Sequence, residues 1–383
     1  MKGRRLWFVG IGGAGLSAYA QLARAWGAEV GGWDRVRTPY LEPLAGVTLE
    51  IGPEPVVPEG WEAVVSSAYP EVPGLRRSEF LRELAAARRS IVVGGTHGKG
   101  TTAAMIAFVL RETGHDPAWV IGAPVPQLGS NAGFGDGYLV VEADESDRTV
   151  FALPAEIAVV TNIELDHHTE YASLGELEEA FDRWLEQAPH VVRAAPPYDG
   201  ELAVPGEHNR LNAGAALGAL AAAGVPRGEA TAALARFTGT GRRFDVHEGD
   251  VTVVDDYGHH PTEIAVTIAA ARERFPGARL RVLFQPHLYS RTRHLAVELA
   301  TALAAADDVT VTDIYAAREQ PIAGVSGRLV VDALSDQGVL AAYTPTVEQG
   351  VTRLVRRAQP GDVLLVVGAG DVDRAVGLLA ERL

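Results

Sequence analysis

Short apolar runs alternate along the chain with longer stretches in which apolar residues recur at helical spacing. Many of the runs end in glycine, aspartate or asparagine, which is typical of buried strands that lead into a turn. This repeated strand–helix pattern predicts an α/β fold with parallel sheets and crossover helices. The predicted strands include RLWFV (5–9), SIVVG (90–94), YLVVEAD (138–144), IAVVTN (157–162), VTVVDD (251–256), RLRVLF (279–284), DDVTVTDI (307–314) and DVLLVV (362–367).

The predicted helices fall between these strands. At 383 residues the chain is longer than a single core usually supports, so two or three domains are expected. Breaks in the pattern favour three domains, which would comprise residues 1–89, 90–238 and 239–383. Helices are expected at about Ser17–Trp26, from Thr102, at 174–187, after His208, and from near Pro261, Ser290, Gly327, Val347 and Asp371.

A glycine turn, GIGGAG, follows the first predicted strand. Gly10, Gly12 and Gly15 fit the G-x-G-x-x-G pattern, and Asp34 ends the next strand, as in a dinucleotide-binding fingerprint. Such a turn leads into a helix N-terminus, which is suited to holding an anionic group.

A second glycine turn, IVVGGTHGKGTT at 91–102, contains an unusual lysine. Lys99 is one of only two lysines in the chain, and arginine supplies nearly all the other positive charge. An ammonium is a compact point charge that fits beside a phosphate oxygen. The strand, turn and following helix would direct backbone N–H groups at a nucleotide phosphate, with Lys99 reaching the β- and γ-phosphates. Because Gly100 follows the lysine, the hydroxyl that binds Mg²⁺ would come from Thr101.

Acidic residues end the next two predicted strands. EADESD places Glu142, Asp144, Glu145 and Asp147 where a carboxylate can hold Mg²⁺ beside a phosphate loop. After the following strand, TNIELDHHTEY offers a histidine, His167 or its neighbour His168, as a metal ligand or base.

The last region carries polar clusters at two strand ends, where open α/β sheets bind ligands. DDYGHHPTE follows one strand and FQPHLYSRTR follows another, and the second contains two arginines. Together they indicate an anionic ligand. The clusters comprise Asp255, Asp256, Tyr257, His259 and His260, and His287, Tyr289, Arg291 and Arg293.

Composition narrows the class of protein. A net charge of −15 argues against a nucleic-acid surface, so an anionic substrate would need a local cluster of donors. The absence of cysteine excludes disulfides, thiolate zinc sites and cysteine nucleophiles. No apolar run approaches the roughly eighteen residues of a membrane span, and the N-terminus runs directly into a strand. We expect a cytoplasmic protein without a membrane partner.

These motifs, in this order, resemble the Mur ligases, and among them the members that join L-alanine to UDP-N-acetylmuramate. The resemblance covers nearly the whole chain. It rests on GIGGAGLS, GTHGKGTT, VVEADESD, TNIELDHH, GEHNRLNAGAA, GTGRRFD, DDYGHHPTE, FQPHLYSRT, IYAAREQPIAGVSGR and VLLVVGAGD.

The resemblance implies a three-domain enzyme that forms an amide from a carboxylate and an amine through an acyl phosphate. A Rossmann-like domain would bind the UDP-sugar, a central P-loop domain would bind ATP with Mg²⁺, and a Rossmann-like C-terminal domain would close over the nucleotide. The implied substrates are UDP-N-acetylmuramate and L-alanine, and the enzyme would be a monomer or homodimer.

The resemblance also assigns residues by motif. Lys99, Glu142, His167 and Arg243 would be catalytic, and Thr101, Glu142 and His167 would hold metal. The implied ATP-binding residues are Gly95, Thr96, His97, Gly98, Lys99, Gly100, Thr101, Thr102, Asn209, Arg243 and Asp256. The implied substrate-binding residues are Gly10, Gly12, Gly13, Gly15, Ser66, Ser67, Tyr257, His259, His287 and Arg291.

The chain differs from the usual pattern in three ways. It is shorter after SSAYP and again between WLEQAPHVVRAAPP and PGEHN, Gly100 replaces a threonine, and LEIGPEP lacks a Gly-His pair. Three alternatives stay open: a murein peptide ligase or a paralogue with another carboxylate donor, an NAD-dependent oxidoreductase based on GIGGAG alone, and a nucleotide-gated binding protein without ligase activity.

Overall fold

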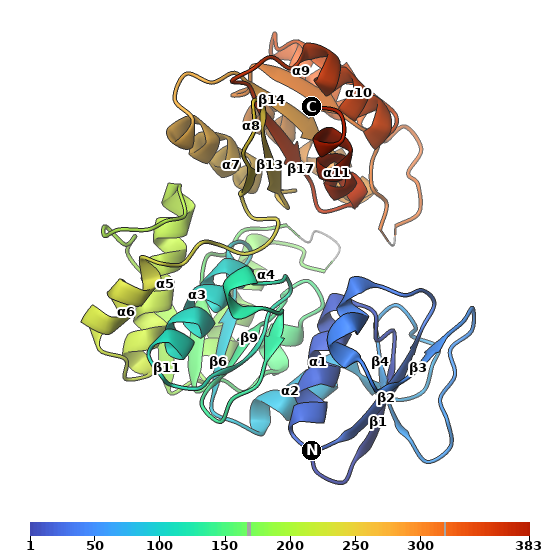
Figure 1. The fold of residues 1–383 in the computed structure, drawn as a ribbon, viewed down its shortest axis with the longest axis vertical. Coiled ribbons are helices and arrows are strands. Elements are labelled where there is room, and N and C mark those ends of the chain that lie inside the picture. Colours follow the sequence, from blue (N-terminus) through green and yellow to red (C-terminus); the bar gives the residue numbers. More distant parts are fainter. Residues whose placement is uncertain (167–169, 318) are drawn as a thin grey trace. The chain divides into compact units, whose positions relative to one another are not determined.

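The computed structural model describes residues 1–166, 170–317 and 319–383. Their contacts divide the chain into two compact units, each with parallel-rich sheets flanked by helices, which confirms the α/β class (Figure 1). The first unit contains 1–164, 173–203 and 210–238, and the second contains 165–172, 204–209 and 239–383.

The first unit begins with a five-stranded sheet in the order β3-β2-β1-β4-β5. Its strands pair in parallel, and the apolar run of β1 is buried at the sheet centre. The carboxyl ends of β1 and β4 therefore meet at one edge, where the first glycine turn lies. The strands are β1 Arg5–Val9, β2 Glu29–Asp34, β3 Thr48–Ile51, β4 Glu62–Val65 and β5 Leu75–Arg76.

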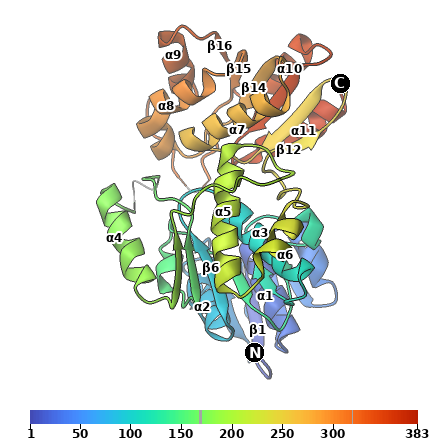
Figure 2. The same ribbon diagram turned by 90° about the vertical axis from the view of Figure 1, so that its left-hand side faces the viewer.

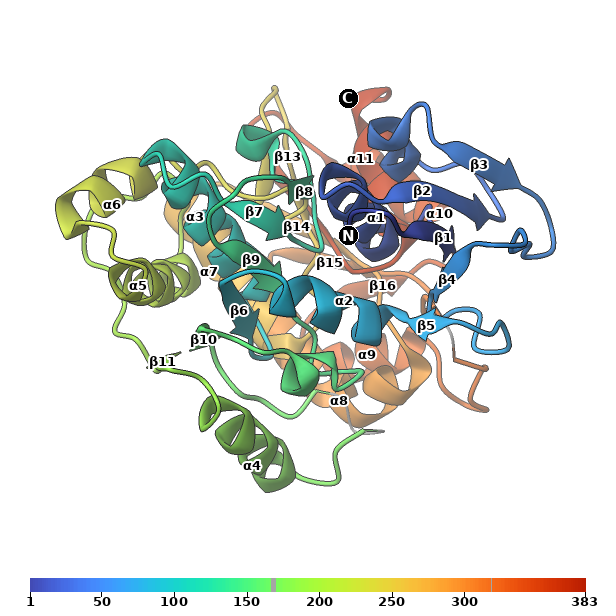
Figure 3. The same cartoon turned by 90° about the horizontal axis from the view of Figure 1, so that it is seen from below.

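A six-stranded sheet in the order β11-β10-β6-β9-β7-β8 forms the rest of the first unit. Strands β6, β9 and β10 are almost completely buried, and α3 (Lys99–Glu112) packs against β6 and β9 (Figures 2 and 3). The second glycine turn thus leaves the centre of this sheet. The strands are β6 Ser90–Gly94, β7 Ala118–Val120, β8 Ala132–Gly133, β9 Leu139–Glu142, β10 Ile157–Val160 and β11 His190–Arg193.

The second unit contains a six-stranded sheet in the order β12-β13-β17-β14-β15-β16, in which only the β12–β13 pair is antiparallel. Alternate strand residues enter two separate apolar cores. Helices α7 (Pro261–Arg274), α8 (Tyr289–Leu303) and α9 (Arg328–Asp336) cover one face, and α10 (Val347–Arg357) and α11 (Arg374–Ala380) cover the other (Figure 1). The strands are β12 Asp245–His247, β13 Thr252–Asp256, β14 Leu280–Phe284, β15 Asp308–Val311, β16 Ala341–Tyr343 and β17 Val363–Val367.

The helices lie close to the predicted positions. Helix α3 begins at Lys99, three residues before the predicted Thr102, because Gly98 takes a left-handed conformation (φ 78°) that ends the loop there. Helix α1 also begins three residues early, at Ala14, and α2 and α6 were not among the predicted helices. No helix in the described part of the chain is both long and apolar enough to cross a membrane. The remaining helices are α1 Ala14–Ala25, α2 Arg77–Ala86, α4 Leu174–Leu185, α5 Glu207–Ala222, α6 Arg227–Leu234, α7 Pro261–Arg274, α8 Tyr289–Leu303, α9 Arg328–Asp336, α10 Val347–Arg357 and α11 Arg374–Ala380.

Candidate active site

The first glycine turn brings several predicted substrate residues together. Gly10 has φ 88°, and a β-carbon there would lie 2.8 Å from that of Ser66, so the turn passes tightly over the end of β4. The Gly12 N–H donates to Asp34 Oδ2 (2.7 Å), while Oδ1 accepts from the Arg35 N–H (2.7 Å). Asp34 therefore holds the turn itself. Gly13 caps α1 with no side-chain hydrogen bond among the described residues, and the position of a β-carbon at Gly15 is open.

The segment that follows β10 holds the second glycine turn in place through hydrogen bonds. Asn162 accepts the N–H groups of Thr96 and His97 with its carbonyl and side-chain oxygens (both 2.9 Å). The Thr161 hydroxyl donates to the His97 carbonyl (2.6 Å), and a β-carbon at Gly95 would lie 2.3 Å from that hydroxyl. Because these two N–H groups bind the protein, the donors available to a phosphate come from the residues that follow.

The N-terminus of α3 provides those donors. Its cap is Gly98, which has no side chain to cap the first turn of this helix. Such a terminus presents backbone N–H groups and a partial positive charge to an anion. Thr101 and Thr102 are buried in the first turn, and the Thr102 hydroxyl has no hydrogen-bond partner in the described part of the chain.

Glu142 lies beside this helix N-terminus. It ends β9 and accepts the Gly122 N–H (2.5 Å). A β-carbon at Gly100 would lie 3.2 Å from both of its carboxylate oxygens. The glycine that departs from the expected threonine thus allows the carboxylate to approach the first turn closely, next to Thr101.

Lys99 is held by a different carboxylate. Its Nζ donates to Glu145 Oε2 (2.8 Å) and to the Gly95 and Thr96 carbonyls (2.8 and 3.0 Å). Glu145 is only 1% exposed. Burial lowers the pKa of the ammonium, but Glu145 and then Asp144 raise it by more, so the pKa lies above its ordinary value and Lys99 is charged.

The other two carboxylates of EADESD stabilise their own loop. Asp144 accepts the Ser146 N–H (3.1 Å) and hydroxyl (2.7 Å). Asp147 accepts the Thr149 N–H (3.1 Å) and lies 3.8 Å from Arg77. Of these carboxylates, Glu142 is therefore the one placed against the helix N-terminus.

In the second unit, the loop of GRRFD is organised around Tyr257. Arg242 and Arg243 each place a guanidinium 5.2 Å from the centre of its ring. Arg242 also donates to Asp255 (3.1 Å) and to the Gly368 carbonyl (2.8 Å). Burial raises the pKa of Asp255 to about 6, although Arg242 opposes this shift. Arg242 has a positive φ of 56°, a strained conformation that is common at functional sites.

Asp256 supports the same loop from β13. Its oxygens accept the N–H groups of Phe244 (2.9 Å) and Gly258 (2.8 Å). Burial raises its pKa, whereas Arg243 and these hydrogen bonds lower it. The structure thus gives Asp256 a positioning role, and its assignment to ATP stays a prediction.

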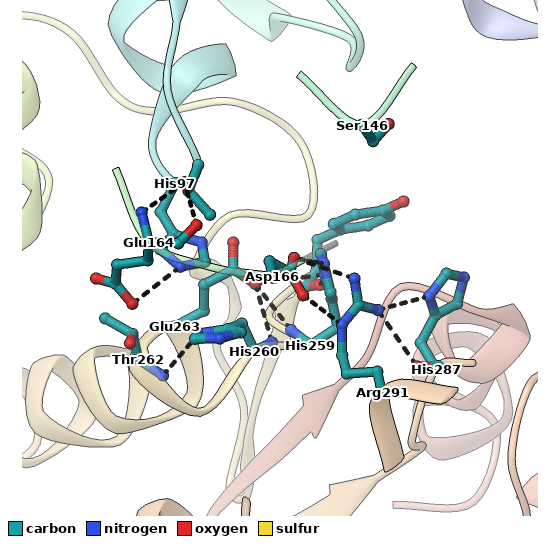
Figure 4. A network of polar contacts seen from close by, with 12 residues as sticks. His97, Ser146, Glu164, Asp166, His259, His260, Thr262, Glu263, His287 and Arg291 are labelled. Carbon is teal, nitrogen blue, oxygen red and sulfur yellow. Dashed lines mark hydrogen bonds and ion pairs between the residues drawn. The ribbon is translucent and has the colours of Figure 1, made fainter. Parts of the chain in front are cut away.

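A buried ion pair joins Arg291, a predicted substrate residue, to Asp166 (Figure 4). Arg291 donates to both oxygens of Asp166 (2.7 and 3.0 Å), and both side chains are 4% exposed. Its remaining nitrogen lies 3.1 Å from His287 Nδ1. Asp166 was not predicted, since only the fold brings the loop after β10 to α8.

The predicted roles of Asn209 and His167 both stay predictions, for different reasons. Asn209 is buried in the second unit, and its side chain donates to the Pro205 carbonyl (2.7 Å), so its role as adenine reader stays a prediction. His167 lies outside the described residues, as does its proposed metal role. The His97 imidazole lies 3.5 Å from the Glu164 carboxylate.

Two histidines make the second unit sensitive to acid. Burial lowers the pKa of His208 and the pKa of His259 to about 4. The positive charge of Arg243 lowers the pKa of His208 further, whereas the negative charge of Glu263 partly raises the pKa of His259. An unfolded histidine titrates near 6.5, so the stabilisation from keeping each neutral is present above that pH and is lost as pH falls through about 4. The raised pKa of Asp255 has the opposite effect on stability. The folded protein holds the Asp255 proton more tightly than the unfolded chain does, so this residue adds stability as the pH falls through about 6.

The variant His208→Gln isolates one of these contributions. We expect the free energy of unfolding of the wild type to fall by roughly 3 kcal/mol more than that of the variant between pH 7 and pH 4, at about 1.4 kcal/mol per pKa unit. Denaturant titrations of both proteins across this range provide the measurement. Parallel pH profiles would show that His208 is not held neutral.

The chain is similar to known proteins over its full length. A family model described as the Mur ligase middle domain matches residues 93–203, and one described as Mur ligase, glutamate ligase domain matches 242–370. The chain is 37% identical to a UDP-N-acetylmuramate–L-alanine ligase of Acidobacterium capsulatum, covering 100% of this chain and 98% of the relative. That alignment spans 453 positions, so the relative carries segments that this chain lacks.

Solved structures show the same fold. The UDP-N-acetylmuramate–alanine ligase of Thermotoga maritima superimposes with a TM-score of 0.81 at 26% identity, covering 99% of this chain and 98% of that one. A murein peptide ligase of Psychrobacter arcticus gives a TM-score of 0.67 at 22% identity, covering 99% and 98%, and is similar in fold.

Proposed function

This chain belongs to the Mur ligase family, and on that premise we propose that it joins L-alanine to the lactyl carboxylate of UDP-N-acetylmuramate at the expense of ATP. The observation that carries the ATP-dependent step is the α3 N-terminus, which has no side-chain cap among the described residues and has Lys99 and Glu142 beside it. The two substrates are those in the names of relatives that match the chain over its full length.

The chemistry requires activation of a carboxylate, which cannot expel oxide unaided. A carboxylate oxygen attacks the γ-phosphorus of ATP, ADP leaves, and an acyl phosphate forms. The amine of L-alanine then attacks the carbonyl carbon, and inorganic phosphate leaves with the original carboxylate oxygen. Catalysis of such a transfer consists mainly of positioning and of stabilising the transferring charge.

Residues of the first unit would carry out the phosphoryl transfer. The N–H groups at the start of α3 would bind phosphate oxygens, and the Lys99 ammonium would offset the developing charge. Lys99 must first exchange at least part of its contact with Glu145 for a phosphate oxygen. Mg²⁺, when bound, would offset further phosphate charge, and the hard oxygen donors Thr101 and Glu142 fit such an ion.

Residues of the second unit would serve the substrates. Arg243 would approach the nucleotide, as its motif implies, with Tyr257 holding its guanidinium in place. The half-buried rings of Tyr257, His259 and His287 would enclose the small side chain of L-alanine. Arg291 is bound to Asp166 and His287, and it would serve the substrate by holding the His287 ring at the same strand ends.

Isotope transfer tests the proposed reaction. With UDP-N-acetylmuramate labelled by oxygen-18 in its lactyl carboxylate, we expect one labelled oxygen in each inorganic phosphate released in the presence of ATP and L-alanine. Unlabelled phosphate would contradict an acyl-phosphate route.

The metal assignment leads to a prediction with a matched control. Glu142→Gln should raise the Mg²⁺ concentration needed for half-maximal activity sharply, because it replaces an anionic ligand of a hard cation with a neutral one. Asp147→Asn, in the same loop but bonded to the Thr149 N–H, should change it much less. Mg²⁺ titrations that gave the opposite order would transfer the ligand role to Asp147.

The proposal extends to a cytoplasmic enzyme that acts as a monomer or homodimer on small molecules. The division at 1–89, 90–238 and 239–383, with one sheet in each part, belongs to the same proposal. A murein peptide ligase is the nearest alternative.

A further inference from the structure

A row of four rings crosses the strand ends of the second unit. Tyr257 and His259, after β13, lie 5.6 Å apart between ring centres, and His259 lies 5.7 Å from His287, which follows β14. The fourth ring belongs to Tyr315, which follows β15 and stacks on His287 at 5.8 Å with an angle of 13° between the planes. Tyr315 therefore extends the row in the direction of the next strand.

The backbone fixes Tyr315 beside His287. The Tyr315 N–H donates to the Pro286 carbonyl (2.9 Å), and the Tyr315 carbonyl accepts the Leu288 N–H (3.0 Å). Leu288 has a φ of 72°, which is a costly conformation for leucine. This strain occurs at the residue that joins His287 to α8, so the local backbone is held in place by its tertiary contacts.

A glycine leaves the space that the Tyr315 ring needs. A β-carbon at Gly370 would lie 2.5 Å from Cγ of Tyr315 and 2.3 Å from Oε1 of Gln285. Any larger residue at position 370 would displace the ring. Despite this close packing on one side, Tyr315 is 39% exposed, so its other side is accessible.

We infer that Tyr315 is a further specificity-determining residue of the amino-acid acceptor site, where its ring limits the length of the acceptor side chain. The inference rests on the proposed function. The first three rings of the row belong to the motifs assigned to the substrates, and the fourth continues the same wall. A rigid aromatic wall suits a methyl side chain and excludes branched ones, because the rings cannot move apart without losing their stacking and backbone contacts.

The test compares L-alanine with L-valine in the variant Tyr315→Ala. We expect the ratio of kcat/KM for L-alanine to kcat/KM for L-valine to fall by about tenfold or more, since a pocket that gains room stops rejecting two extra methyl groups. Both values come from one preparation, so partial unfolding of the variant leaves the ratio unaffected. Tyr315→Phe keeps the ring and should retain the wild-type ratio. Should Tyr315→Ala yield no folded protein, Tyr315→Leu serves in its place with the same expected direction.

A matched control is Tyr343→Ala at the end of β16. Tyr343 lies on the neighbouring strand, stacks with Arg328 and belongs to no part of the proposed site. The variant Tyr343→Ala should leave the ratio of kcat/KM for L-alanine to kcat/KM for L-valine unchanged. An unchanged ratio in Tyr315→Ala, or an equal change in Tyr343→Ala, would overturn the inference.

An assay of the wild-type protein tests the proposed function independently of this inference. Phosphate release with UDP-N-acetylmuramate tests the function, whereas the change of ratio tests Tyr315. If only another carboxylate donor supported phosphate release, the proposed function would be wrong, and the ratio would still be measured with that donor.

Discussion

Replacing Lys99 by methionine should lower the rate of ATP-dependent phosphate release by about 10²-fold or more, the usual cost of removing a preorganised charge from a transition state. Methionine has a similar length but cannot offset the charge of the transferring phosphoryl group. Phosphate release at saturating ATP and substrates is the measurement. A variant with near wild-type turnover would refute the phosphate-loop assignment.

The Lys99–Glu145 pair requires a control for stability. Glu145 is buried, so the loss of its lysine partner is expected to destabilise the protein in addition to lowering activity. The double variant Lys99→Met with Glu145→Gln removes both charges. It should recover much of the stability and none of the activity, whereas Glu145→Gln alone should keep activity well above that of Lys99→Met.

The variant Asp166→Asn should cause a large loss of both folding stability and activity. It removes the charge that Arg291 binds with two hydrogen bonds in a site closed to solvent, and breaking such a pair costs about 3–5 kcal/mol of folding free energy. We also expect kcat/KM per folded molecule to fall, because Arg291 lies beside His287 and loses its fixed orientation.

Asp308→Asn provides the matched control. Asp308 is another buried aspartate of the second unit, and it binds Arg281, Arg353 and Arg357 at the beginning of β15, whereas the substrate motifs follow the carboxyl ends of the strands. Its loss should also lower the free energy of unfolding but should leave kcat/KM of the folded fraction unchanged. Equal losses of activity in both variants would mean that Asp166 acts only through stability.

Local patterns in the sequence predicted most of the fold. Buried parallel strands give continuous apolar runs, and this is why β6, β9, β10 and β14 were recognisable without tertiary information. The start of α3 was placed three residues too late, because the left-handed turn at Gly98 cannot be read from composition. The glycine turns and the isolated Lys99 indicate the proposed phosphate loop from the sequence alone, because this signal depends on only a few neighbouring residues.

Features that depend on distant residues were not predictable. The partner of Lys99 is Glu145 and not Glu142, although both belong to one motif, and only the direction of each side chain after β9 separates them. Asp166 and Tyr315 are brought to α8 and β14 by the fold. No spacing in the sequence relates them to FQPHLYSRT.

The central claim concerns the pair of substrates, and a matrix of carboxylate donors and amino acids tests it most directly. The enzyme is incubated with ATP and Mg²⁺, and ADP formation is measured with UDP-N-acetylmuramate, a UDP-sugar lacking the lactyl carboxylate, a free peptide and a folate, each with L-alanine, glycine, L-serine and L-glutamate. We expect rapid ADP formation with UDP-N-acetylmuramate and L-alanine, modestly slower formation with glycine because one methyl group contributes only about 1–3 kcal/mol, and none with the donor that lacks the carboxylate. ADP formation with the peptide or folate and not with UDP-N-acetylmuramate would contradict the account.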